Sequence, residues 1–196
     1  TGWYTLSLHD ALPIFLDREE ISSAGNTSAT SLFISDVYEA ILAFDGESGL
    51  YHRLRKAQSN SKAISADTTE AYNPTWKAVF DSHNVPNVNG GVTICKFTGA
   101  GGKRDSSEAS SEFMAALIEL FDKSGVKWQT GELGKVDEGG GGTVAKFLAS
   151  YNMDVIDIGP ACMSLHSPTE LISKFDLYSS YEAYLSFLNF KGEFNL

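Results

Sequence analysis

The chain is 196 residues long and 42% hydrophobic, so it is long enough to bury a sizeable core in one globular domain or a large piece of one, and its composition excludes a disordered protein. Its formal net charge is −10 at pH 7. This acidic balance argues against a nucleic-acid partner, which would need clustered Lys and Arg to neutralise phosphates.

The N-terminal end has an unusual pattern. Residues 7–14 translate the codons TCC CTA CAC GAC GCT CTT CCG ATC, which resemble a common sequencing-library adapter read in frame. We therefore predict that residues 1–14 derive from an adapter and that native sequence begins near Phe15. On this interpretation, the neighbouring His9 and Asp10 do not form a catalytic pair.

The first half of the remaining chain predicts two helices and two strands. Residues 28–44 carry apolar side chains at helical spacing, which favours a helix packed on a sheet, and residues 51–57 predict a shorter helix. Residues 63–66 predict a strand that ends at Asp67. After a loop, residues 92–97 have the β-branched and aromatic content of another strand.

The second half continues this alternation. Ser106 or Ser107 is predicted to cap a helix. The later elements are a strand at 126–131, a glycine-rich loop at 134–143, a helix through Val144 and Leu148, a buried strand at 154–158 and a helix at 177–188. An aromatic stripe that begins just before this last helix is expected in the core: Phe175, Tyr178, Tyr181 and Tyr184. Alternating strands and helices predict a three-layer α/β sandwich with a mainly parallel sheet.

The two cysteines and the apolar runs indicate the cellular setting. Cys95 and Cys162 lie far apart and predict reduced interior thiols rather than a disulfide framework. No apolar run approaches the roughly 20 residues that cross a bilayer, and the N-terminus lacks a basic segment followed by a hydrophobic one. We therefore expect a cytoplasmic protein with no membrane partner.

Acidic and imidazole side chains follow several of the predicted strands. Glu19 and Glu20 come after a short apolar run that we interpret as a strand. Asp67 ends another strand, and His166 lies in the loop after a third. Functional loops of parallel α/β folds lie beyond the carboxyl ends of the strands, so one rim could hold all of these side chains. Glu, Asp and His are the ligand types of a hydrolytic zinc centre.

Four segments, in the same order, resemble the aspartyl aminopeptidase family. Residues 15–27, with Glu-Glu at their centre, look like its Glu-Glu segment, and residues 60–67 look like its Ser-Ala-Asp motif. Residues 135–143 resemble its glycine-rich loop, and residues 157–168 resemble its C-terminal histidine motif. The resemblance covers the chain from about Phe15 to its end, and four ordered motifs make it specific.

This resemblance implies a dinuclear zinc aminopeptidase that acts on peptides and forms a homo-oligomer. Family members have an α/β catalytic domain with a dimerisation domain inserted in its first half. The chain, over residues 15–196, is similar to the C-terminal part of that catalytic domain, without the upstream His-x-Asp segment and the bridging aspartate. With three of five expected ligands, the isolated chain is expected to bind zinc weakly and to hydrolyse little.

The resemblance also implies a role for each motif residue. Glu20 and His166 match the ligands that share one zinc ion, and Asp67 matches the acid on the second. Glu19 matches the general base, which can act at neutral pH because zinc lowers the pKa of bound water to about 7. Ser22 stands where relatives commonly have glycine, which restricts the backbone beside the metal.

Residues on the substrate side follow from the same match. Lys103 lies in a loop that could pair an ammonium group with an acidic N-terminal residue of the peptide. We interpret Gly140 and Gly141 as a wall of the peptide cleft, with Asp137 ordering their loop. Relatives include enzymes for neutral residues as well, so the preference for an acidic residue is an expectation.

Two other classes of function compete with this one. A non-catalytic α/β interaction module would retain the fold without the chemistry. A nucleotide-binding protein would use the glycines 139–142 at a helix N-terminus, but the Gly-Lys-Ser/Thr ending of a phosphate loop is missing. The basic cluster of Arg53, Arg55 and Lys56 is interpreted as a solvated helix face rather than an anion site.

Overall fold

A computed structural model describes residues 13–44, 46, 49–101, 104–135, 137–192 and 194. The helices are α1 (Phe33–Ala43), α2 (Leu50–Asn60), α3 (Ser111–Ser124), α4 (Ala145–Ala149) and α5 (Lys174–Asn189), with the 3-10 helices η1 (Glu19–Ile21) and η2 (Pro74–Val79). The strands are β1 (Lys62–Ser65), β2 (Thr69–Glu70), β3 (Val92–Cys95), β4 (Phe97–Ala100), β5 (Arg104–Glu108), β6 (Trp128–Thr130), β7 (Asp154–Gly159), β8 (Ala161–Met163) and β9 (Leu171–Ile172).

The central sheet has four strands in the order β1-β7-β3-β6. Strand β7 pairs in parallel with β1, and β3 pairs in parallel with β6, while β3 and β7 run antiparallel. Parallel pairings therefore predominate, which confirms the predicted mainly parallel sheet. Every residue of β7 after its first is buried, as expected for a strand covered on both faces.

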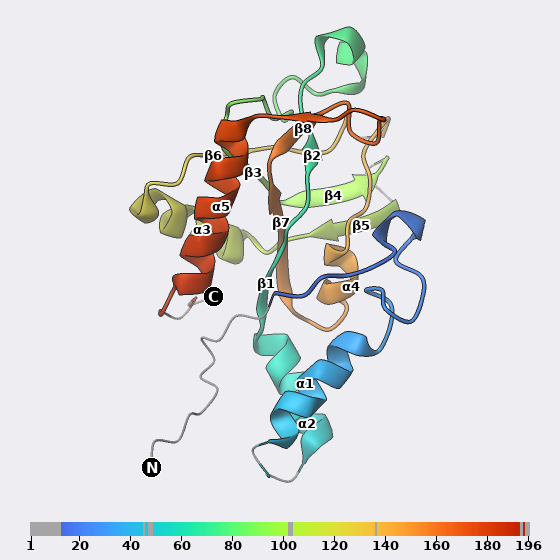
Figure 1. The fold of residues 1–196 in the computed structure, drawn as a ribbon, viewed down its shortest axis with the longest axis vertical. Coiled ribbons are helices and arrows are strands. Elements are labelled where there is room, and N and C mark those ends of the chain that lie inside the picture. The colour runs from blue at the N-terminus through green and yellow to red at the C-terminus, as the bar shows by residue number, and fades with distance from the viewer. Residues whose placement is uncertain are drawn as a thin grey trace.

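Helices cover both faces of this sheet (Figure 1). On one face, α3 and α5 pack around a core that includes Ile156 and Ile158 of β7. On the other face, Val155 of the same strand packs with Ile34 of α1 and Ala145 of α4. Successive residues of β7 point to opposite helical layers, as the two-residue period of a strand requires. The three layers agree with the predicted α/β sandwich.

A hairpin occupies the predicted start of the helix α3. The sequence predicts Ser106 or Ser107 as its cap, but both lie in β5, which pairs antiparallel with β4. The helix begins at Ser111, and its cap is Ser110, whose hydroxyl accepts a hydrogen bond from the backbone N–H of Phe113. The predicted cap is wrong because pairing with β4, which local sequence does not reveal, holds the earlier serines in a strand.

The aromatic residues of α5 lie mostly at the surface. Phe175, Tyr178 and Tyr181 are 46%, 57% and 58% exposed. Tyr184 is partly buried, and its hydroxyl donates a 2.7 Å hydrogen bond to the carbonyl of Ile158. The predicted core position is therefore wrong for three of the four residues. Helical spacing identifies a shared face but does not tell whether another element covers it.

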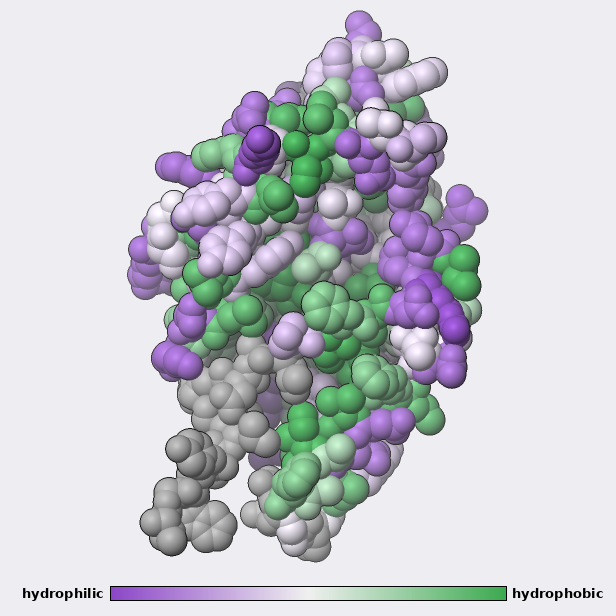
Figure 2. All heavy atoms as spheres, viewed as in Figure 1, coloured by the Kyte–Doolittle hydropathy of each residue, from purple (hydrophilic) through white to green (hydrophobic). Residues whose placement is uncertain are grey.

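Other apolar side chains are divided between the interior and the surface. Cys95 and Cys162 are buried and free, which confirms the prediction of interior thiols. Figure 2 shows hydrophobic residues gathered over α1 and α2, where Leu32, Phe33 and Phe44 are exposed. Within the described ranges, no helix combines the length and the apolar character that a membrane crossing requires.

Candidate active site

The paired acids lie in a tight turn rather than after a strand. Glu19 and Glu20 begin η1, and the apolar residues 14–16 before them pair with no strand of the described chain, so that part of the prediction is wrong. Arg18 and Ser22 flank the turn with left-handed φ angles of 63° and 64°. This conformation costs about 1–2 kcal/mol for a residue other than glycine. Ser22 therefore stands where glycine would be unstrained.

Asp67 lies just beyond the end of β1, as the sequence predicts. Its carboxylate accepts a 2.7 Å hydrogen bond from the backbone N–H of Thr68. The backbone of Asp67 passes so close to Gly159 that a Cβ atom there would overlap the Asp67 carbonyl oxygen. The glycine that ends β7 therefore allows the Asp67 segment to lie against the sheet.

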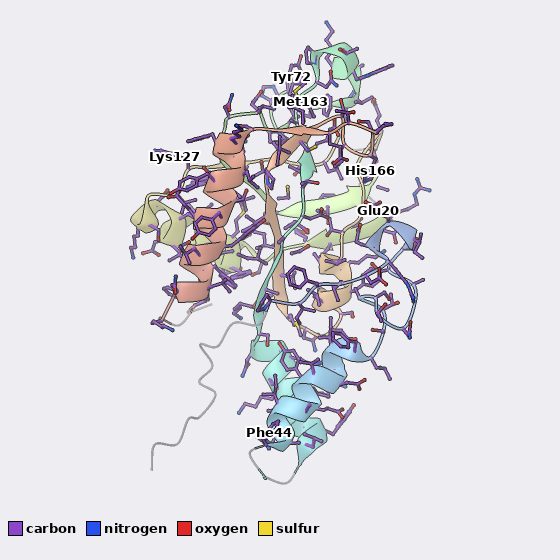
Figure 3. The ribbon with its side chains drawn as sticks, in the orientation of Figure 1. Glu20, Phe44, Tyr72, Lys127, Met163 and His166 are labelled. Carbon is purple, nitrogen blue, oxygen red and sulfur yellow. The ribbon has the colours of Figure 1, made fainter. Side chains whose placement is uncertain are left out.

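Glu20 and His166 meet although they lie near opposite ends of the chain. Nε2 of His166 is 3.4 Å from Oε1 of Glu20. Figure 3 shows the two labelled residues on the same side of the molecule, one in the η1 turn and one in the loop after β8. The side chains of His166 and Glu20 are 69% and 72% exposed, so the pair is accessible from solvent.

Glu19 and Asp67 belong to the same electrostatic cluster. Burial raises the pKa of Glu19, the negative charges of Asp67 and Glu20 raise it further, and His166 lowers it. Burial also raises the pKa of Asp67, where the hydrogen bond from Thr68 opposes the increase and the charge of Glu20 adds to it. Carboxylates that crowd together in this way favour a shared proton or a cation among them.

This set of donors fits zinc in part. Carboxylate and imidazole side chains are both good zinc ligands, and the Glu20–His166 pair offers one of each. Among the residues that the structure describes, no three His, Cys, Asp or Glu side chains are close enough to hold a metal ion together. A four-coordinate site therefore needs ligands beyond this pair.

A further carboxylate is buried on the central sheet. Asp157 of β7 is in register with Ser65 of β1 and Cys95 of β3, so the three side chains share one face. Its Oδ2 accepts a 3.0 Å hydrogen bond from the hydroxyl of Thr143. Burial raises the pKa of Asp157 to about 6, and the charge of Asp67 contributes to the increase.

The glycine-rich loop packs closely against the β4–β5 hairpin. Gly140 has a φ of 96°, and a Cβ atom there would overlap the carbonyl oxygen of Gly99. The N–H of Gly101 donates a 2.7 Å hydrogen bond to the carbonyl of Gly139. Asp137 also has a left-handed backbone, with a φ of 67°. Glycine is required at position 140 because both the φ angle and the close contact exclude a side chain.

A cavity of about 330 Å³ lies between this loop and the histidine loop. Gly140, Gly141 and His166 line it. The rest of its wall is mainly apolar, with one carboxylate and one amide side chain, and is formed by Trp76, Val79, Phe80, Leu133, Leu165, Glu70, Asn73, Gly134 and Gly139. Its volume is at the lower end of the range for ligand sites. Lys103, the predicted partner of an acidic substrate residue, lies outside the described residues.

Two glutamates near the site are not singled out by the sequence. Oε2 of Glu70 accepts a 3.1 Å hydrogen bond from the backbone N–H of Leu165, and Oε1 of Glu170 accepts a 2.6 Å hydrogen bond from the backbone N–H of His166. Acceptors of backbone N–H groups have no sequence motif of their own. Their closeness in sequence to Asp67 and His166 is the only signal that could have found them.

The chain matches known proteins over most of its length. A family model described as Aminopeptidase I zinc metalloprotease (M18) matches residues 7–188. A relative from Borrelia garinii subsp. bavariensis, named "Probable M18 family aminopeptidase 1", is 45% identical over 179 residues, which are 90% of this chain and 39% of that protein. The crystal structure of an M18 aminopeptidase from Thermotoga maritima has a TM-score of 0.85 at 44% identity, over 89% of this chain and 39% of that chain.

A more distant solved structure, the mApe1 dodecamer of S. cerevisiae, has a TM-score of 0.66 at 23% identity, over 88% of this chain and 36% of that chain. At this identity the likeness shows the fold alone. The chain spans 39% of the length of the Borrelia garinii relative and 39% of the length of the Thermotoga maritima chain.

Proposed function

The chain belongs to the M18 family of aminopeptidase I zinc metalloproteases, and on this premise we propose that the intact protein is a zinc-dependent aminopeptidase that removes N-terminal residues from peptides. The observation that carries the proposal is the 3.4 Å approach of His166 to Glu20, which brings two distant motifs together and supports our assignment of both side chains as zinc ligands. Glu19 interacts electrostatically with both members of this pair.

We assign Glu20 and His166 to one zinc ion, Asp67 to a second and Glu19 to the general base. Bound zinc would polarise the peptide carbonyl and make water a better nucleophile at neutral pH. The pKa of Glu19 is raised, first by burial, and a raised pKa suits a carboxylate that takes a proton from the attacking water and passes it to the leaving amine.

Two classes of N-terminal residue fit the surroundings of this site. We propose an acidic residue first, because the family resemblance places Lys103 in a substrate-side loop, where it would pair with the carboxylate of that residue. The cavity beside His166 favours a neutral apolar residue as the second candidate, since Trp76 and Phe80 form part of its wall and Glu70 would repel a negative charge. Hydrolysis rates of peptides that begin with Asp, Glu, Leu or Phe separate the two classes.

We propose a cytoplasmic homo-oligomer with peptide substrates and no nucleic-acid or membrane partner. The dodecamer of the distant mApe1 relative supports the oligomer, and the net charge of −10 supports the lack of a nucleic-acid partner. Size-exclusion chromatography with light scattering on the intact protein would measure its subunit number.

A non-catalytic interaction module is the competing function. It is favoured by the finding that no three potential ligands in the described part of the chain cluster tightly enough to hold a metal. Such a module would keep the family fold without a zinc-dependent activity. The two candidates therefore differ in their response to metal removal.

The test uses protein expressed from the complete gene and release of an N-terminal amino acid as the readout. We expect a chelator to abolish release and added zinc to restore it. Glu19→Gln should retain zinc but lose about 10²–10⁴-fold in kcat, because the proton acceptor is gone. Glu112→Gln, which changes an exposed glutamate on α3, is the matched control. A protein with no chelator-sensitive release would be the interaction module.

A further inference from the structure

The loop that carries His166 has an unusual backbone. Ser164 and His166 both adopt left-handed conformations, with φ angles of 61° and 64°. Neither residue is glycine, so both conformations are strained and persist only where surrounding contacts fix them. The contacts that fix this loop are therefore expected to determine where the His166 imidazole lies.

Two carboxylates hold adjacent N–H groups of this loop. Glu70 accepts a 3.1 Å hydrogen bond from the backbone N–H of Leu165, and Glu170 accepts a 2.6 Å hydrogen bond from the backbone N–H of His166. Hydrogen bonds to an ionised acceptor are stronger than those between neutral groups. The loop is therefore held at two successive N–H groups, immediately beside the proposed metal-binding side chain.

The sheet topology explains how the two carboxylates reach the same loop. The three-stranded sheet has the order β2-β8-β9, and the loop connects β8 to β9. Glu70 is the last residue of β2, on one side of β8, and Glu170 comes directly before β9, on the other side. The loop is thus held from both flanks of the strand from which it emerges.

We propose that Glu70 and Glu170 are positioning residues that hold His166 with its Nε2 toward Glu20, so that the zinc-binding pair is formed before the metal arrives. This inference rests on the proposed metal-binding role of Glu20 and His166. Neither glutamate needs to touch the metal or the substrate. Contacts that orient metal ligands in this way typically contribute 10–100-fold to metal affinity.

The test is an NMR titration of the 196-residue chain with Co²⁺, followed by broadening of the His166 imidazole resonance. His52 and His83, which are exposed, serve as internal references. We expect Glu170→Ala and Glu70→Leu to raise the Co²⁺ concentration for half-broadening of His166 by about tenfold or more. Glu170→Gln and Glu70→Gln keep an oxygen acceptor and should stay within about threefold of the parent.

The glutamine variants separate position from charge, because they remove the negative charge but keep the hydrogen bond. If glutamine and the apolar substitution weaken Co²⁺ binding equally, or if neither does, the positioning role is refuted while the zinc-site proposal stands. If His166 of the parent is broadened no earlier than His52 and His83, the metal site fails and this inference fails with it. Thermal unfolding of each variant checks that the fold is intact.

Discussion

The buried carboxylate of Asp157 provides a quantitative test of the structure. The variant Asp157→Asn keeps the shape of the side chain, and its amide oxygen can still accept the hydrogen bond from the Thr143 hydroxyl. The variant removes the negative charge that burial makes unfavourable. We therefore expect Asp157→Asn to stabilise the protein at neutral pH and to remove one source of its pH dependence.

The expected size follows from the pKa. Burial raises the pKa of Asp157 from its ordinary value of 3.8 to about 6. At 1.36 kcal/mol for each pKa unit, this difference corresponds to about 3 kcal/mol. Because the folded-state pKa is raised, the folded protein binds the proton more tightly than the unfolded chain does. In the parent protein, the stability that protonated Asp157 contributes is thus complete below about pH 4 and is lost as the pH rises through about 6.

Urea unfolding followed by circular dichroism, at about pH 4 and about pH 8, measures this effect. The free energy of unfolding of Asp157→Asn minus that of the parent should rise by up to about 3 kcal/mol between the two pH values. Glu112→Gln on the exposed face of α3 is the control, for which we expect little change in this difference. An equal difference at both pH values for Asp157→Asn would refute the burial argument.

Three other measurements test separate parts of the structure. Phe113→Ala should lower the free energy of unfolding by about 3–5 kcal/mol in urea, because Phe113 is fully buried in the core between α3 and the sheet, and a loss under about 1 kcal/mol would contradict that core. In the full-length protein, Gly140→Ala should raise KM about tenfold or more, whereas Gly141→Ala, whose Cβ would meet only the Leu133 side chain, should raise it less. Equal increases in KM for the two variants would contradict the interpretation of the tight packing at Gly140 as a wall of the peptide cleft. Calorimetry on the isolated chain should show only weak zinc binding, and tight stoichiometric binding would contradict the expected need for further ligands.

The sequence predicts the central layers of this fold well, because buried strands and amphipathic helices leave periodic patterns. The strand expected at 154–158 is β7, and the helix expected after Ser106 or Ser107 is α3. The predictions that are wrong concern residues whose positions depend on contacts with segments distant in the sequence. Ser106 lies in β5 rather than at a helix cap because β4 pairs with it, and the exposure of Tyr181 depends on what covers α5.

Some features of the candidate site can be predicted from the sequence, and others depend on the three-dimensional structure. Glu20 and His166 could be paired from the order of the motifs, since the resemblance assigns both to one zinc ion, whereas their spacing in the sequence carries no such information. The roles of Glu70 and Glu170 could not be predicted, because they accept bonds from backbone N–H groups that every segment offers. The raised pKa of Asp157 depends on its position inside a sheet whose strand order the sequence does not state.

We propose that Glu20 and His166 bind one zinc ion together in the intact protein. The most direct measurement is the zinc content of the full-length protein and of its His166→Ala variant, after dialysis against metal-free buffer. We expect two zinc ions per chain in the parent and a loss of one of them in the variant. A variant that retains as much zinc as the parent would show that His166 is not a zinc ligand.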